Sequence, residues 1–308
     1  MAKFYEVLLE QICKIVDALA AQAKKVMEEE RIAYSPEEKS DKILLGYMNA
    51  KIKLIPNQKR NVKFSNELRQ KISNEEFERD GALISKCGAK KITKLIELFK
   101  CKFKNGKNMN YHLSRQVFDS TRFDTLLNTW NIKRIHLSDK TSTSKSSMKK
   151  NRSEWLLFCI VKNDSVYFLD VLDHPKNENF TSCHFLQIAH KNNWMKHIGF
   201  KEIKDVKPDS LNVKITKDED IYKLYKSCVN FLFEFEGKIY IPSFGIASSR
   251  DKAINPMNLI ALKKFLREPL GQYGEYLCIK FDSADSLNGI LYFREGSCKF
   301  YFEDIILS

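Results

Sequence analysis

The spacing of hydrophobic residues predicts a helical start to the chain. Over residues 4–30, apolar side chains recur at steps of three and four, as on the buried face of an amphipathic helix. Residues 35–38 (SPEE) place a serine N-cap, a proline and two acids in the order that begins a helix. Residues 67–78 and 89–103 form two more helical segments. We therefore expect helices to dominate this part of the chain.

Beyond residue 106 the pattern changes to short helices and strands. Residues 123–130 are predicted to be helical, and residues 133–137 to form a strand. Two β-rich apolar runs, 155–161 and 166–172, flank a Lys-Asn-Asp-Ser turn and predict a hairpin. A helix over residues 182–192 follows.

The C-terminal part has a similar hairpin-then-helix outline. Residues 231–235 and 238–241 predict a second hairpin across a Glu-Gly turn, and residues 255–267 predict a helix that opens on Asn-Pro. Three strands are predicted to close the chain, at residues 276–281, 289–294 and 299–302.

These elements predict an α+β fold of three consecutive domains. Residues 1–106 would form a helical domain that becomes basic toward its end. Residues 107–204 would form a central small α/β unit with an antiparallel hairpin, and residues 205–308 a hairpin-rich α+β domain. A Ser-, Thr- and Lys-rich stretch at residues 139–153 has almost no apolar content and is expected to be an exposed loop of the central unit.

Composition places the chain in a reducing, aqueous compartment. The first six residues lack the basic start and apolar run of a signal peptide. The longest strongly apolar stretch, residues 155–161, is far shorter than the roughly 20 residues that span a bilayer. The 8 cysteines are scattered and form no CxxC pair. We expect a cytoplasmic protein with no membrane partner and no disulfide framework.

The positive charge is confined to one segment. Residues 81–152 hold 17 Lys and Arg against 4 Asp and Glu, whereas the rest of the chain is balanced. Lysines that serve solubility alone would be spread evenly, so the clustering predicts a surface that binds a polyanion, RNA more than DNA. The residues nominated for nucleic-acid binding are Lys90, Lys94, Lys102, Lys104, Lys107, Arg115, Lys140, Lys145, Lys149 and Lys150.

All 6 histidines lie within residues 112–197. His136 shares one face of its predicted strand with Arg134 and Ser138, and His174 follows the second strand of the hairpin, on the same face as Asp170. Histidine is the usual proton carrier near neutral pH, so this segment is a candidate active site. The alternatives are an ordinary polar edge strand at His136 and a turn at His174.

Neither a metal nor a cofactor is expected. The histidines after the hairpin are six and seven residues apart, unlike a helical zinc pair, and no phosphate-binding glycine motif is present. Cleavage of a phosphodiester without a metal requires a base, an acid and cations near the phosphate. Arg134, His136, Arg152 and His174 supply those side-chain types.

The order of these motifs resembles a known family. Residues 134–138 (RIHLS), the loop, the two apolar strands and His174 resemble the sheet of small RelE/HigB-type messenger-RNA interferase toxins, within residues 134–200. Uncharacterised bacterial proteins of similar layout share the pattern. The resemblance implies metal-independent RNA cleavage by side chains on the sheet face, and nominates Arg134, His136 and His174, with Arg152. Those toxins are much shorter than this chain, and the two flanking domains have no counterpart.

The sequence leaves three functions open. The first is a nucleic-acid-directed effector, namely a metal-independent ribonuclease of a bacterial toxin or phage-defence system, with a neutralising or complex-forming protein partner. The second is a non-catalytic DNA- or RNA-binding subunit of a larger complex. The third is an interaction protein that binds an acidic protein partner through residues 81–152.

Overall fold

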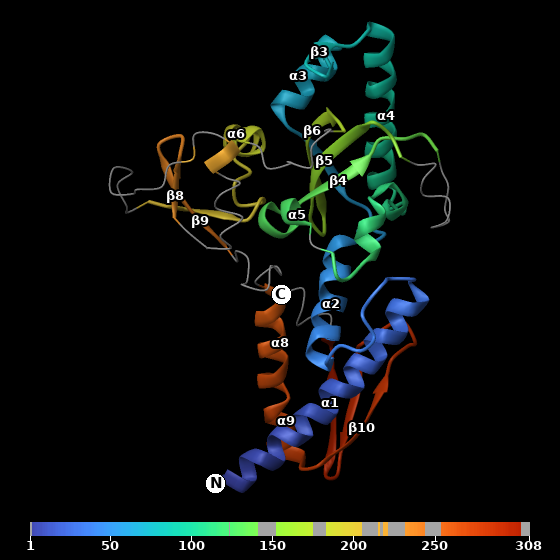
Figure 1. Ribbon diagram of the computed structural model, residues 1–308, viewed down its shortest axis with the longest axis vertical. Coiled ribbons are helices and arrows are strands. Elements are labelled where there is room, and N and C mark those ends of the chain that lie inside the picture. The colour runs from blue at the N-terminus through green and yellow to red at the C-terminus, as the bar shows by residue number, and fades with distance from the viewer. Residues whose placement is uncertain are drawn as a thin grey trace. The chain divides into compact units, whose positions relative to one another are not determined.

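The computed structural model describes residues 2–122, 124–140, 152–174, 183–204, 215, 218–220, 232–243 and 254–302 (Figure 1). Within these residues the protein has the predicted α+β fold, with helices at its start. Lys145, Lys149 and Lys150, which were nominated for nucleic-acid binding, lie outside the described residues.

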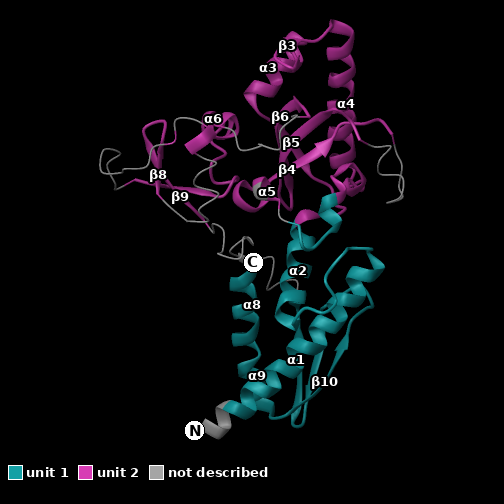
Figure 2. Cartoon of the chain, in the orientation of Figure 1, with its two compact units in different colours: residues 1–52, 116–123, 251–308 teal, residues 53–115, 124–250 magenta. Residues whose placement is uncertain are grey.

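The chain divides into two compact units, each made of separate stretches of sequence (Figure 2). Unit 1 comprises Met1–Ile52, Gln116–Phe123 and Asp251–Ser308, and unit 2 comprises Lys53–Arg115 and Asp124–Arg250. This division differs from the three consecutive domains 1–106, 107–204 and 205–308, because the ends of the chain pack together.

Unit 1 combines N-terminal helices with C-terminal helices and strands. Its elements are α1 (Ala2–Glu29), α2 (Ser40–Lys53), α8 (Ile254–Phe265), α9 (Arg267–Tyr273), β10 (Tyr276–Phe281), β11 (Gly289–Phe293) and β12 (Gly296–Phe300). The three strands form an antiparallel sheet in the order β10-β11-β12. Gln22 of α1 donates hydrogen bonds to the carbonyl oxygens of Ala284, at 2.7 Å, and Ser286, at 3.2 Å. These bonds fix the turn after β10 against α1.

Unit 2 is built on a four-stranded sheet. Its order is β1 (Asn61–Phe64), β6 (Ser165–Asp173), β5 (Trp155–Val161) and β4 (Ile132–His136). β1 pairs parallel with β6, and the other pairs are antiparallel. The register places Phe158 opposite both Arg134 and Asp170, so these three residues share one face.

Helices cover both faces of this sheet (Figure 1). On one face α4 (Lys86–Lys104) packs Phe103 against Phe168, with ring centroids 5.8 Å apart. On the other face lie α5 (Thr125–Trp130) and α6 (Cys183–Lys191), and Phe185 contacts Phe158 at 4.6 Å. Both faces are therefore dry, which explains why β5 and β6 are continuous apolar runs in the sequence.

The remaining described elements of unit 2 surround this core. They are α3 (Asn66–Asn74), β2 (Glu78–Arg79), β3 (Ala82–Leu83), the 3-10 turns η1 (Asn110–His112) and η2 (Arg115–Phe118), β7 (Phe200–Ile203), β8 (Phe233–Phe235) and β9 (Lys238–Pro242). β9 pairs with both β7 and β8 in a separate three-stranded sheet, so the second predicted hairpin belongs to unit 2 and not with the last strands. The η2 turn crosses the boundary between the units: Arg115 belongs to unit 2, and the rest of the turn belongs to unit 1.

None of the described helices is long and apolar enough to cross a lipid bilayer.

Candidate active site and nucleic-acid interface

The four residues nominated for catalysis gather at the end of β4, within unit 2. The ring of His136 stacks on the ring of His174, with centroids 5.9 Å apart and planes inclined by 18°. The charges of Arg152 and Arg134 also act on His136. Strands β4 and β6 lie on either side of β5, and their ends bring the two histidines together. The sequence nominated both histidines without placing them together, and the fold brings their rings side by side.

His136 is poised as a proton acceptor. It is 7% exposed, and burial lowers its pKa below the usual histidine value. Its hydrogen bond to Ser153 acts in the opposite direction, and the positive charges of His174, Arg152 and Arg134 lower the pKa further. The Nδ1 atom lies 2.9 Å from the carbonyl oxygen of Ser153 and 3.4 Å from the backbone nitrogen of the same residue. The shorter contact is with an atom that can only accept, so Nδ1–H donates to the carbonyl oxygen. The Nε2 atom of the neutral ring is then the acceptor.

His174 is exposed at the end of β6. Its backbone N–H donates to the carbonyl oxygen of Glu154 at 2.5 Å, which continues the β5–β6 ladder and fixes the backbone at this point. Asp170 was expected on the same strand face as His174, but its carboxylate binds Lys71 and His184.

The two arginines differ in how far they are neutralised. Arg134 is half-buried and forms an ion pair of 2.9 Å with Asp124, the residue that also caps the start of α5. Arg152 is exposed and has no ion-pair partner among the described residues. Arg152 is therefore the cation of this group that can meet an incoming anion.

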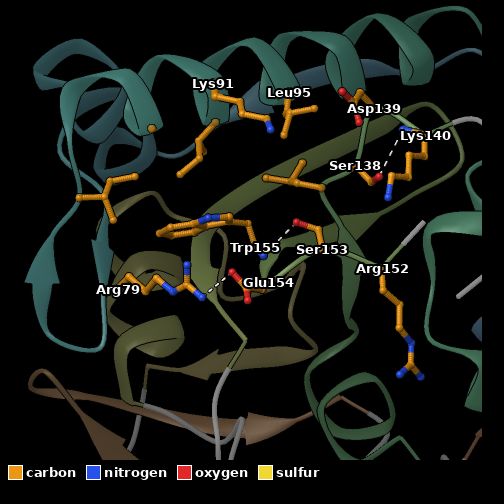
Figure 3. Close-up of a pocket in the computed structure, with 14 residues that line it drawn as sticks. Arg79, Lys91, Leu95, Ser138, Asp139, Lys140, Arg152, Ser153, Glu154 and Trp155 are labelled. Carbon is orange, nitrogen blue, oxygen red and sulfur yellow. Dashed lines mark hydrogen bonds and ion pairs between the residues drawn. The ribbon is translucent and has the colours of Figure 1, made fainter. Parts of the chain in front are cut away.

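A cavity of about 410 Å³ opens next to this group, between α4 and the segments around residues 137–140 and 152–155 (Figure 3). Its lining residues are Arg79, Ile84, Gly88, Lys91, Ile92, Leu95, Leu137, Ser138, Asp139, Lys140, Arg152, Ser153, Glu154 and Trp155. Arg152 and Ser153 belong both to this lining and to the surroundings of His136, whereas neither His136 nor His174 lines the cavity. The cavity and the histidines are thus neighbours joined by one short segment.

The outer side of α4 forms a basic ridge. Lys86, Lys90, Lys94 and Lys104 are exposed and recur at helical spacing along one side. None of these four has an ion-pair partner among the described residues, and the helix contains one acid, Glu97, which pairs with Lys100. This surface can follow the phosphates of a nucleic acid. Among the other nominated residues, Lys107, Arg115 and Lys140 are also exposed.

Lys102 has a different environment from the other nominated lysines. Its Nζ lies 2.9 Å from Nε2 of His112 and 4.9 Å from the ring centroid of Phe99. Burial lowers the pKa of Lys102, and burial together with the charge of Lys102 lowers the pKa of His112 to about 4. The ammonium donates inward to this buried ring. The sequence carries no signal for the contact, because it depends on how the η1 turn packs on α4.

A second buried polar group was not found from the sequence. The carboxylate of Asp170 is 0% exposed and accepts from Lys71 Nζ at 2.8 and 2.9 Å and from His184 Nε2 at 2.6 Å. Asp170 lies in an apolar strand run, and a buried carboxylate must be paired, so the sequence did hold a signal for a partner. The partners themselves come from α3 and α6, and only the tertiary fold identifies them.

Among the described residues, no group of three His, Cys, Asp or Glu side chains is placed to hold a metal ion. No family model, curated protein or solved structure matches this chain. The chemistry of the site is therefore what points to a function.

Proposed function

We propose that this protein binds RNA along the basic ridge of α4 and cleaves it without a metal ion, using His136 and His174 to move protons. The observation that supports this best is the stacked pair of imidazoles beside Arg152, which forms no ion pair with any residue that the structure describes. Burial lowers the pKa of His136, which suits it to accept a proton, and the exposed His174 is assigned the role of proton donor in the proposed reaction.

The proposed reaction is a transesterification in which the ribose 2′-oxygen attacks the adjacent phosphate. Nε2 of His136 takes the proton of the ribose 2′-hydroxyl, whose oxygen forms a bond to the adjacent phosphorus. The bond from phosphorus to the 5′-oxygen breaks, and this oxygen takes a proton from His174. The products are a 2′,3′-cyclic phosphate and a free 5′-hydroxyl. Arg152 balances the charge that develops on the phosphorane, and Arg134 helps to keep His136 neutral.

Purified full-length protein and end-labelled RNA in a chelating buffer test this proposal. We expect fragments that end in a 2′,3′-cyclic phosphate, and a loss of rate of about 100-fold or more for His136→Ala and for His174→Ala. His190→Gln, which changes a histidine on α6 outside the pair, is the control and should cleave normally. RNA that stays intact with the unmodified protein would end the catalytic proposal.

A non-catalytic role in binding DNA or RNA is the second candidate. It is favoured by the α4 ridge, which needs no chemistry, and by the absence of both histidines from the cavity lining. A binding subunit would retain salt-sensitive affinity for a strand in His136→Ala and would release no fragments from it. Binding without turnover in the experiment above selects this function.

The biological setting follows from the proposed reaction. A ribonuclease that needs no metal would be active wherever RNA is present, so we place the protein in the cytoplasm as a toxin or phage-defence effector. An acidic protein that covers the α4 ridge and Arg152 would neutralise such an effector, because it would occupy the surface that RNA needs.

A further inference from the structure

We propose that the cavity beside the histidines is a subsite for one nucleoside monophosphate unit of the RNA strand. The base would lie between Trp155 and the apolar side chains of α4, and the phosphate would bind Lys91 and Lys140. This inference rests on the proposed function and adds to it how the strand is held next to the cleavage site.

The walls of the cavity suit a flat, aromatic group. Its volume of about 410 Å³ is within the range of small-ligand sites, roughly 300–1,000 Å³. In Figure 3 the indole of Trp155 is seen close to edge-on, so one face of the ring is turned toward α4. Leu95 lies on the α4 side of the cavity, and the aliphatic side chains of Ile84 and Leu137 also line it. Single-stranded RNA is recognised by stacking its bases on such aromatic rings.

The ring of Trp155 packs against a buried aromatic side chain. It makes an edge contact with Phe77, with centroids 6.3 Å apart and planes inclined by 78°. Phe77 is itself buried, so the indole is fixed before any ligand binds. A base would therefore meet a preformed stacking surface, which lowers the entropic cost of binding.

The charges of the cavity suit one phosphate. Glu154 is neutralised by its ion pair with Arg79, which leaves Asp139 as the acid in the lining without such a pair. Lys91, Lys140 and Arg152 have no ion-pair partner among the described residues, and all three line the cavity. The balance is cationic and favours an anion.

The polar side chains at one end can contact the edge of a base. The hydroxyl of Ser138 accepts from the backbone N–H of Lys140 at 3.2 Å, and its own hydrogen has no acceptor within the part of the chain that the structure describes. The carboxylate of Asp139 is exposed and accepts hydrogen bonds only. This pair complements the ring nitrogens and amino groups of a base, whereas inorganic phosphate would leave both the pair and the apolar walls unused.

Calorimetric titration of the full-length protein with nucleoside 5′-monophosphates tests the subsite. Ribose 5-phosphate, which lacks the base, is the matched probe, and we expect it to bind at least tenfold more weakly. Lys91→Ala should weaken monophosphate binding about fivefold or more, and Leu95→Trp, which fills the cavity, should abolish it. Lys191→Ala, an exposed lysine at the end of α6, is the control. Equal affinity for the two probes, or equal effects of Lys91→Ala and Lys191→Ala, would overturn the subsite.

The same variants separate this inference from the cleavage proposal. His136→Ala should lose cleavage and keep monophosphate binding. If RNA is cleaved with an unchanged KM in both Lys91→Ala and Leu95→Trp, the subsite is wrong and the ribonuclease stands. If monophosphates bind and RNA is not cleaved, the ribonuclease proposal is wrong and the subsite stands.

A trinucleotide with 2′-O-methyl riboses, which cannot be cleaved by the proposed route, identifies the source of the ligand. Tighter binding of the trinucleotide than of the monophosphate supports a unit of an RNA strand. Equal or weaker binding would identify a free nucleotide as the ligand and overturn the strand assignment.

Discussion

At the scale of single residues, the contact between Lys102 and His112 makes the stability of unit 2 depend on pH. The ammonium of Lys102 can only donate, so Nε2 of His112 must accept and the ring must be neutral. A proton on Nε2 would place two cations in contact inside the fold. Burial and the charge of Lys102 accordingly hold the pKa of His112 at about 4.

This contact predicts a loss of stability in acid. The unfolded chain has a histidine pKa of about 6.5, so between that value and about 4 the unfolded state binds a proton that the folded state does not. The free energy of unfolding should therefore fall as the pH falls through this window. His112→Gln keeps a hydrogen-bond acceptor and cannot be protonated. In this variant the free energy of unfolding should fall less steeply with falling pH, by about 1 kcal/mol per pH unit. Urea denaturation across this range measures it, and parallel curves for the two proteins would contradict the prediction.

The candidate site illustrates what the sequence reveals about single residues. Strand alternation groups His136 with Arg134 and Ser138, and His174 with Asp170, but only the pairing of β4 and β6 with β5 brings the two histidines together. The environment of Lys102 could not be foreseen, since a lysine on a basic helix looks the same in sequence whether it meets solvent or a buried ring. The ion pair of Arg134 with Asp124 likewise depends on where α5 packs, which the hydrophobic pattern leaves open.

At the scale of elements, Asp170 joins three of them. Lys71 comes from α3, His184 from α6 and the carboxylate from the middle of β6. Removing one member of a buried charged group leaves the others without compensation. The group therefore fixes both helices to the sheet.

Substitution of this carboxylate should be costly. Asp170→Asn keeps the shape of the side chain and removes its charge, and we expect it to lower the free energy of unfolding by about 2 kcal/mol. This loss is smaller than that for a fully buried pair because the side chains of Lys71 and His184 are 28% and 37% exposed, and solvent screens their charges. Glu275→Gln, in the exposed pair with Arg294, is the control and should cost under about 1 kcal/mol. Similar losses for both variants in urea denaturation would show that Asp170 does not stabilise the fold in this way.

The α4 ridge can be tested as an element through its salt dependence. Each lysine that contacts a phosphate of a single strand adds about 0.7 to the slope of log Kd against log salt. Lys90→Gln combined with Lys94→Gln should weaken RNA binding and reduce this slope by about 1. Lys14→Gln with Lys25→Gln, on α1, changes the net charge equally and should leave the slope unaltered. Identical slopes for the two double variants would exclude the ridge from the interface.

Elements with a strong local pattern were predicted well from the sequence. The strands β5 and β10 and the helix α4 lie where the apolar runs and the three-to-four spacing place them. The strand β1 was missed because it is four residues long and half-exposed, and its parallel partner β6 is distant in sequence. A helix expected to start at residues 35–38 begins instead at Ser40.

At the scale of the whole molecule, the chain is not a series of consecutive domains. Hydrophobic patterns report which face of an element is buried, but not against what it packs. The last strands were assigned to residues 205–308, yet Gln22 of α1 binds the turn after β10, and Tyr47 of α2 contacts Phe302 with centroids 6.1 Å apart. The N-terminal helices and the C-terminal helices and strands thus form one folded unit.

This organisation predicts that residues 205–308 do not fold alone. The fragment contains β8 and β9, which pair with β7 outside it, and β10, which needs α1. We expect an isolated fragment to show no cooperative thermal transition by circular dichroism, whereas the full-length protein shows one or more. A cooperative transition of the fragment would restore the three-domain description.

The order in which the units are completed has a consequence for synthesis. Unit 2, which holds His136, His174 and the basic ridge, is complete once residue 250 has left the ribosome, but unit 1 waits for its last strands. Because domains fold as they emerge, the nascent chain presents a finished unit 2 while the apolar side of α1 is still uncovered. Until the last strands emerge, we therefore expect α1 to expose apolar side chains that β10 and α9 later cover.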